Sequence, residues 1–257
     1  MSIFYYTVVF FAGLAFGSFL NAWVFRKREN IRIVSGRSLC IFCHHQLAWY
    51  ENIPVFSFIF LKGKCRTCRK QISWQYPLVE LALAVVFVLT AWWHWTGPFV
   101  LTVELLRDWI LVFNLAFIFL YDLRYGEILD GPTIPTAILL FFFSLPLGWH
   151  TWQSMLIGIA VGAGIFLFQY LISSGKWIGG GDIRLGLLMG VILGWPNILV
   201  ALLLAYVFGG FISMILVWGK KTNLQSETPF GTYLTAATFV AMFFGETIIN
   251  WYLGMLG

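Results

Sequence analysis

The chain has 257 residues, of which 60% are hydrophobic and only 11% are charged, and its formal net charge is +5. This composition excludes a soluble globular domain and indicates a membrane protein. Apolar stretches of roughly 20 residues, long enough to cross a hydrocarbon core of ~30 Å, recur along the sequence. We therefore expect an all-α polytopic membrane protein.

About eight of these stretches are predicted to be transmembrane helices. They lie at residues 3–25, 77–96, 102–121, 131–148, 152–173, 183–195, 197–218 and 230–252. The first stretch lacks a basic start and a small-residue cleavage site, so we interpret it as a retained span. The predicted organisation is a first helix over 1–25, a polar insert over 26–76 and a transmembrane domain over 77–257.

Basic residues are distributed unevenly. Ten of the sixteen Lys and Arg residues fall in the insert. On an alternating path through the membrane, most of the others fall on the same face: Arg124, Lys176, Arg184, Lys220 and Lys221. Only Arg107 falls opposite. The positive-inside rule then predicts a cytoplasmic insert with both termini outside, and the basic insert is suited to contact anionic lipid.

In the first predicted span, Gly13, Gly17 and Asn21 recur every four residues and share one helix face. Small residues at this spacing let a second helix approach closely, and the Asn amide can bond across the contact. Helix packing is one interpretation, and a place near an active site is the alternative.

The insert carries all four cysteines, in two Cys-x-x-Cys pairs: Cys40 with Cys43, and Cys65 with Cys68. Disulfides are disfavoured on a reducing cytoplasmic face, and a redox pair explains two such motifs less well than metal does. The pattern predicts a tetrahedral zinc site with four thiolates and no open position, which is structural rather than catalytic. His44 and His45 are then expected to face solvent.

Carboxylates mark the ends of several predicted helices. Glu80 follows Pro77 in what we expect to be a first turn, so helix capping and a functional role are both open. Asp130, just before the fourth span, is interpreted as an N-cap. Asp122 ends the third span, where a carboxylate opposes the helix dipole, and capping does not explain it.

Asp182 follows three glycines, Gly179, Gly180 and Gly181, and precedes the sixth span. It is predicted at the same depth as Asp122. Two neighbouring carboxylates share one proton, so that one can activate water while the other protonates a peptide carbonyl. A proton-coupled transporter would also use such acids, and it is the alternative function. Pro229 and Gly231 permit irregular backbone at the start of the last span.

Taken together, these motifs resemble those of the bacterial type IV prepilin peptidases. They are Gly17-Ser-Phe-Leu-Asn21, the paired Cys-x-x-Cys motifs, Tyr76-Pro-Leu-Val-Glu80, Asp122 with Asp130, Gly179–Asp182 and Pro229-Phe-Gly231. The resemblance covers nearly the whole chain. It implies an intramembrane aspartyl protease with Asp122 and Asp182 as the catalytic pair, the four cysteines as metal ligands, and the other motif residues as active-site support. The domain over 77–257 would then be the peptidase domain.

The resemblance also implies substrates and a cofactor. Prepilins or type II secretion pseudopilins would lose a basic leader after a glycine at the cytoplasmic face of the inner membrane. Many members then methylate the new amino terminus with S-adenosylmethionine. No nucleic-acid partner is expected, and whether the chain forms a homodimer is left open. A further alternative is a zinc-stabilised membrane scaffold that binds pilus-assembly proteins and catalyses no reaction.

Three positions depart from the family pattern. Leu129 stands where Pro is usual, Pro132 replaces a common Leu, and Thr232 occupies a position where Pro often follows Pro-Phe-Gly. All three fall in predicted loops or helix entrances, so we expect them to affect local backbone and substrate fit rather than the acid pair.

Overall fold

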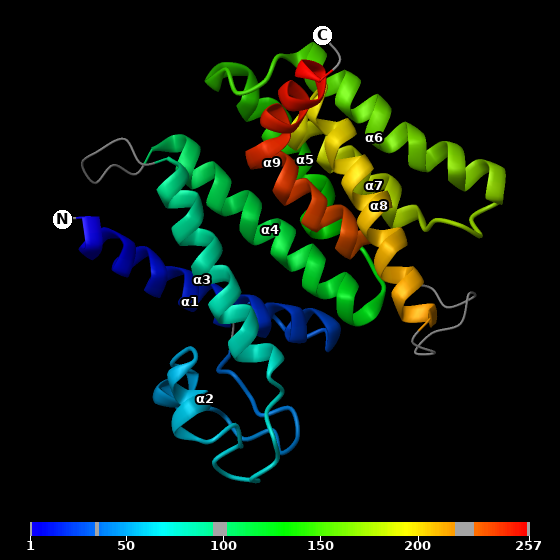
Figure 1. The fold of residues 1–257 in the computed structure, drawn as a ribbon. Helices are drawn as coiled ribbons and strands as arrows, with labels where there is room; N and C mark the ends of the chain where they lie inside the picture. The colour runs from blue at the N-terminus through cyan, green and yellow to red at the C-terminus, as the bar shows by residue number, and fades with distance from the viewer. Residues whose placement is uncertain (1, 34–35, 95–101, 219–228, 256–257) are drawn as a thin grey trace. The chain divides into compact units, whose positions relative to one another are not determined.

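A computed structural model describes residues 2–33, 36–94, 102–218 and 229–255 (Figure 1). In these residues the fold is helical, with two isolated β-bridges in the insert. The chain divides into two compact units, Met1–Phe113 and Asn114–Gly257. Each unit is described by itself below.

All eight predicted spans are helices. They are α1 (Ser2–Arg28), α3 (Gln75–Trp93), α4 (Val103–Tyr125), α5 (Asp130–Leu147), α6 (Trp152–Ser173), α7 (Gly180–Leu193), α8 (Asn197–Trp218) and α9 (Phe230–Gly254). Trp95 and Thr96, at the end of the second predicted span, lie outside the described residues, as do Lys220 and Lys221. The break at Trp195-Pro196 is confirmed, because α7 ends at Leu193 and α8 begins at Asn197.

Six of these helices are long and apolar enough to cross a membrane. The other two of the eight are α4 and α7. Helix α7 has only 14 residues, which corresponds to roughly 21 Å of helix. Helix α4 has 23 residues but carries five charged ones: Glu104, Arg107, Asp108, Asp122 and Arg124. The all-α polytopic class is confirmed, and these two helices are the ones that carry Asp122 and Asp182.

In the first unit, α1 and α3 pack side by side (Figure 1). A Cβ atom added at Gly13 would lie 2.5 Å from Cα of Ala84, and one at Gly17 would lie 2.6 Å from Cα of Glu80. Only glycine permits so close an approach of the two backbones. The Asn21 side chain donates a hydrogen bond from Nδ2 to the Tyr76 carbonyl oxygen at 3.1 Å. The helix-packing interpretation of this face is therefore confirmed.

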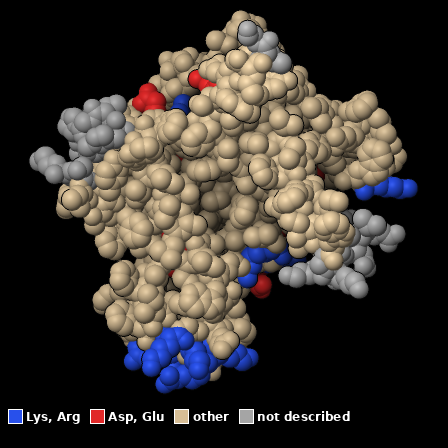
Figure 2. Space-filling model, in the orientation of Figure 1, with Lys and Arg blue, Asp and Glu red and all other residues tan. Residues whose placement is uncertain are grey.

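The insert lies between α1 and α3 and contains a short 3-10 helix, η1 (Trp49–Asn52), and α2 (Phe56–Phe60). Lys and Arg side chains gather on its surface (Figure 2). Buried Glu80 of α3 accepts a hydrogen bond from the Val55 backbone N–H at 2.7 Å. Because α3 begins at Gln75, Glu80 lies beyond the first turn, and of the two roles left open for it the structure does not support capping. Its carboxylate instead fastens the insert to α3.

In the second unit, α6 and α7 pack through two pairs of glycines. A Cβ atom at Gly162 would lie 2.4 Å from the Gly186 carbonyl oxygen, and one at Gly158 would lie 2.5 Å from that of Gly190. Both helices therefore use the four-residue glycine spacing seen in α1. This close contact fixes α7, whose first turn carries Asp182.

Candidate active site and metal centre

Asp122 lies in the last turn of α4 and is almost completely buried, with 3% of its surface exposed. Its Oδ2 accepts a hydrogen bond of 2.8 Å from the backbone N–H of Thr232. Thr232 lies in the first turn of α9, so the positive end of that helix dipole is directed at the carboxylate. The N-terminus of α9 therefore compensates for the unfavourable position of Asp122 at the end of its own helix.

Asp182 is the third residue of α7 and is 8% exposed. Its Oδ2 accepts a hydrogen bond of 3.2 Å from the Gly179 N–H, and its own N–H donates to the Gly179 carbonyl oxygen at 3.2 Å. The side chain thus caps its own helix, a structural role that the sequence analysis did not consider. Like Asp122, it is held through Oδ2 by a backbone N–H at a helix N-terminus.

Asp122 and Asp182 lie around the same residue in the second unit, because Ile128 packs against Gly181, the neighbour of Asp182, and against Gly231, where an added Cβ would also meet Oδ2 of Asp122. Within the described residues, the backbone N–H groups bond to Oδ2 of each carboxylate and not to Oδ1. The Oδ1 atoms therefore remain available for water or substrate. A buried pair that shares one proton is the arrangement required for acid–base hydrolysis.

Ile128, in the short connection between α4 and α5, packs against the entrances of two other helices. A Cβ atom added at Gly181 would lie 2.9 Å from Cβ of Ile128, and one at Gly231 would lie 2.8 Å from its Cδ1. The same added Cβ at Gly231 would also lie 2.8 Å from Oδ2 of Asp122. Gly181 and Gly231 are therefore needed for close approach around the acid pair. The role of Ile128 was missed, because an apolar residue in a loop gives no chemical signal.

The three glycines before Asp182 are not equivalent. An added Cβ at Gly180 would meet no atom within 4 Å, and one at Gly179 would meet only ordinary contacts, the nearest being Oδ2 of Asp182 at 3.7 Å. Packing explains Gly181 alone. Pro229 is the N-cap of α9, and its carbonyl oxygen accepts a hydrogen bond from Oγ1 of Thr232 at 2.6 Å.

Asp130 differs from its expected role. It is the first residue of α5, the N-cap position belongs to Leu129, and no side chain caps the helix. Its carboxylate instead pairs with the guanidinium of Arg184 in α7, and both side chains are about half exposed. The N-cap interpretation is therefore wrong, because an ion pair with a distant residue competes for the carboxylate. Gly17, Asn21 and Glu80 belong to the first unit and take part in the α1–α3 packing described above.

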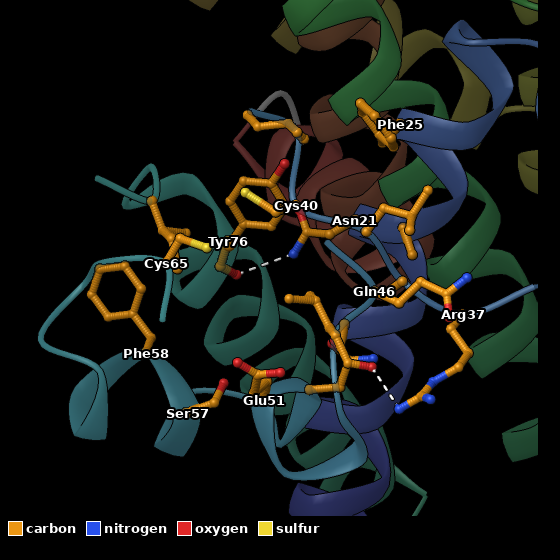
Figure 3. Close-up of a pocket in the computed structure, with 18 of the residues that line it drawn as sticks. Asn21, Phe25, Arg37, Cys40, Gln46, Glu51, Ser57, Phe58, Cys65 and Tyr76 are labelled. Atoms are coloured by element: carbon orange, nitrogen blue, oxygen red, sulfur yellow. Dashed lines mark hydrogen bonds between the residues drawn. The ribbon is translucent and has the colours of Figure 1, made fainter. Parts of the chain in front are cut away.

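The four cysteines form a compact cluster in the insert, and Figure 3 shows two of them, Cys40 and Cys65, in the wall of a pocket beside α1 and α3. Their Sγ atoms all lie within 4.8 Å of one another, which allows one ion to contact all four. All are free thiols, and Cys40 and Cys68 are 3.9 Å apart at sulfur. His44 and His45 are exposed, as expected. The donor set could hold a metal ion, and thiolates select soft or borderline ions.

The two Cys-x-x-Cys motifs have the same backbone hydrogen bonds. In each, the first cysteine donates its N–H to the carbonyl five residues later and accepts from the N–H four residues later. The N–H donors are Cys40 and His44 in one motif, and Cys65 and Arg69 in the other. Backbone N–H groups of Cys68 and Thr67 lower the pKa of the Cys65 thiol to about 7, despite its burial. A lowered pKa favours the thiolate form that a metal requires.

Comparison with known proteins identifies the family. Residues 11–94 match the bacterial peptidase A24 N-terminal domain, and residues 109–214 match the type IV leader peptidase family. A prepilin leader peptidase/N-methyltransferase of Aeromonas hydrophila is 31% identical over 97% of this chain and 94% of its own length. The chain belongs to the type IV leader peptidase family. It is a bacterial multi-pass membrane enzyme of that family.

Other relatives extend over most of the chain. A prepilin leader peptidase/N-methyltransferase of Bacillus subtilis is 29% identical over 97% of the chain and 98% of its own length. One of Myxococcus xanthus is 32% identical over 87% of the chain and 68% of its own length. No solved structure matches. The predicted resemblance to the leader peptidases is therefore confirmed.

Proposed function

We propose that this leader peptidase is an aspartyl endopeptidase that removes the basic leader of type IV prepilins or related pseudopilins after a glycine. The observation that carries the proposal is the buried pair of Asp122 and Asp182. Two helix N-termini hold one oxygen of each carboxylate and leave the others available. The names of the relatives support prepilins as the substrates.

The reaction follows from the chemistry of the pair. The ionised carboxylate removes a proton from water while the water oxygen attacks the scissile carbonyl carbon. The protonated carboxyl group donates its proton to the carbonyl oxygen at the same time. The tetrahedral intermediate then collapses: the leaving nitrogen takes up a proton from the protonated carboxyl group, and a hydroxyl of the intermediate returns its proton to the ionised carboxylate, which restores the pair with one proton. No covalent bond to the enzyme forms. The two carboxyl groups titrate as a pair, so the apparent pKa values of the reaction belong to both residues together.

The topology of the proposed substrate fits this site. A prepilin leader is basic and cytoplasmic, and an apolar segment follows it into the membrane. Positive charge in the insert supports an orientation with Asp122, Asp182 and the insert at the cytoplasmic face and both termini outside. Unobstructed space at Gly180 supports an approach of substrate backbone beside Asp182. Asp130, which pairs with Arg184 in the same unit, is proposed to support the site.

Two further groups belong to the proposal. Zinc would be held by Cys40, Cys43, Cys65 and Cys68 and would stabilise the fold of the insert. With four thiolate ligands, the ion would have no coordination position open for catalysis. S-adenosylmethionine, when bound, would supply a methyl group to the new amino terminus, as the names of the relatives suggest.

A cleavage assay with mass measurement of the product tests the proposal. Purified full-length enzyme is incubated with a prepilin in detergent or liposomes, with and without S-adenosylmethionine. We expect cleavage after a glycine in both conditions and a mass increase of one methyl group only with the cofactor. Intact prepilin after incubation would contradict the peptidase assignment, and an unmethylated product would contradict the second activity alone.

A further inference from the structure

Three aromatic rings from three helices of the second unit meet at the first turn of α9. They belong to Phe166 of α6, Tyr206 of α8 and Phe230 of α9, which we call the aromatic cluster. The ring centroid of Phe230 is 6.2 Å from that of Phe166 and 5.2 Å from that of Tyr206. Both separations fall in the range of about 4.5–7 Å in which aromatic pairs attract each other beyond the burial of their area.

The side chain of Phe230 fixes the turn that holds Asp122. Phe230 is the first residue of α9, and the next two residues contact the carboxylate. An added Cβ at Gly231 would lie 2.8 Å from Oδ2 of Asp122, and the N–H of Thr232 donates its hydrogen bond to the same oxygen. Because a backbone N–H moves only with its own helical turn, the position of Asp122 depends on where α9 begins. The contacts of Phe230 join this turn to α6 and α8.

Phe166 also contacts the helix that carries Asp182. A Cβ atom added at Gly186 would lie 2.7 Å from Cδ2 of Phe166, so the ring lies directly against the backbone of α7. Gly186 follows Asp182 by four residues, which is about one turn along the same side of the helix. Phe166 is completely buried, and in a close-packed interior its ring cannot move without displacing a neighbour. One ring therefore touches both α7 and the first residue of α9.

Tyr206 holds the cluster together from α8. Its hydroxyl accepts a hydrogen bond from Nε2 of Gln169 at 2.8 Å and donates one to Oε1 of the same side chain at 3.1 Å. Gln169 lies in α6, three residues after Phe166. The hydroxyl thus ties α8 to the helix that carries Phe166. Since α7 and α9 also pack against each other, the cluster braces an existing contact between the two helices that hold the aspartates.

These contacts lead us to propose that Phe166 is a positioning residue of the peptidase. It holds the first turn of α9, through Phe230, at a fixed distance from α7, and thereby sets the separation of Asp122 and Asp182. Phe166 acts through its neighbours and not on the substrate. The inference rests on the proposed function, because it assumes that the two aspartates act together in cleavage.

A double-mutant cycle on the contact between Phe166 and Phe230 tests this role. Full-length enzymes with Phe166→Leu, Phe230→Leu or both changes are assayed for prepilin cleavage in detergent, and kcat and KM are determined separately. Leucine keeps each position apolar but is too short to maintain the contact. Each single change should lower kcat by about 100-fold, the effect of displacing a catalytic group by about 1 Å, and should leave KM within about threefold of wild type.

The double variant separates one shared contact from two independent defects. If both changes break the same contact, the double variant should lose about 100-fold in kcat, as each single variant does. Independent defects would multiply to a loss of about 10,000-fold, and that result would overturn the inference. Phe230 is only partly buried, so Phe230→Leu tests the contact even where Phe166→Leu does not fold. Wild-type kcat in folded Phe230→Leu would also overturn the inference.

The matched control is Met155→Ala. Met155 is as completely buried in α6 as Phe166 and lies about three turns away from it. This change should destabilise the protein by removing buried volume, yet leave kcat within about threefold of wild type at a temperature where circular dichroism shows all variants folded. An equal loss of kcat in Met155→Ala would show that packing of α6 in general is responsible, and not Phe166. Wild-type enzyme that leaves prepilin intact would instead contradict the proposed function.

Discussion

The backbone N–H of Thr232 donates a 2.8 Å hydrogen bond to Oδ2 of Asp122, although the two residues are 110 positions apart in the sequence. This bond connects the end of α4 to the beginning of α9. Gly231 makes it possible, because a side chain there would lie 2.8 Å from the same carboxylate oxygen. Asp122 is thus positioned by the first turn of another helix.

Gly231→Ala should therefore displace Asp122. We expect prepilin cleavage to fall by roughly 100-fold, since a displacement of about 1 Å in a catalytic group has effects of this size. Thr232→Pro removes the N–H but leaves the space open, and proline is tolerated in a first helical turn. It should keep cleavage within about tenfold of wild type. Equal loss in both variants would show that the hydrogen bond, rather than the clearance, positions Asp122.

Replacing either aspartate should abolish cleavage without unfolding the protein. Asp122→Asn and Asp182→Asn each keep an acceptor oxygen for the N–H that holds them but cannot exchange a proton. We expect losses of roughly 10²–10⁴-fold or more in the rate of prepilin cleavage. Glu246→Gln, at an exposed position in α9, is the control and should be unaffected. Normal cleavage by either Asn variant would remove that residue from the mechanism.

The rate of cleavage should be bell-shaped in pH. The proposed pair is active with one proton, so the rate should decrease at acidic pH, where both carboxyl groups are protonated. It should also decrease at higher pH, where both are ionised. Initial rates measured across the pH range, with circular dichroism to monitor folding, check this expectation. A rate that rises to a plateau with no second limb would indicate a single titrating group.

Some of this arrangement could be predicted from the sequence and some could not. The helices follow from the length of the apolar stretches, and Asp122 and Asp182 stand out because a carboxylate beside an apolar helix needs a reason. The roles of Thr232, Ile128 and Arg184 depend on contacts between segments that are distant in the sequence. A backbone N–H group or an apolar loop residue leaves no sequence motif from which such a contact could be predicted. The N-cap assignment of Asp130 failed for the same reason, because its ion pair with Arg184 joins distant segments.

Removal of metal should unfold the insert while the helices remain. Purified enzyme is expected to contain about one zinc ion per chain, held by four thiolates. A chelator should release the ion and make all four cysteines reactive toward a thiol reagent. Cys65→Ser should lower the metal content more than Arg69→Lys, which keeps the neighbouring backbone. Four reactive thiols in untreated enzyme, with no metal found, would contradict the site.

The glycine contact between α6 and α7 should be sensitive to a single methyl group. A Cβ at Gly162 would lie 2.4 Å from the backbone carbonyl oxygen of Gly186, which cannot move aside as a side chain can. Gly162→Ala should therefore destabilise the folded protein by about 1–3 kcal/mol, as overpacking does elsewhere. Denaturation in detergent, followed by circular dichroism, measures the change.

Gly164→Ala is the matched control for that contact, because it lies on the same helix and an added Cβ would meet no atom within 4 Å. It should leave the protein as stable as wild type, or slightly more stable, since alanine favours the helix. Because the first turn of α7 carries Asp182, separation of α6 from α7 should also lower cleavage in Gly162→Ala. Equal stability of the two variants would show that α7 does not depend on close backbone packing against α6.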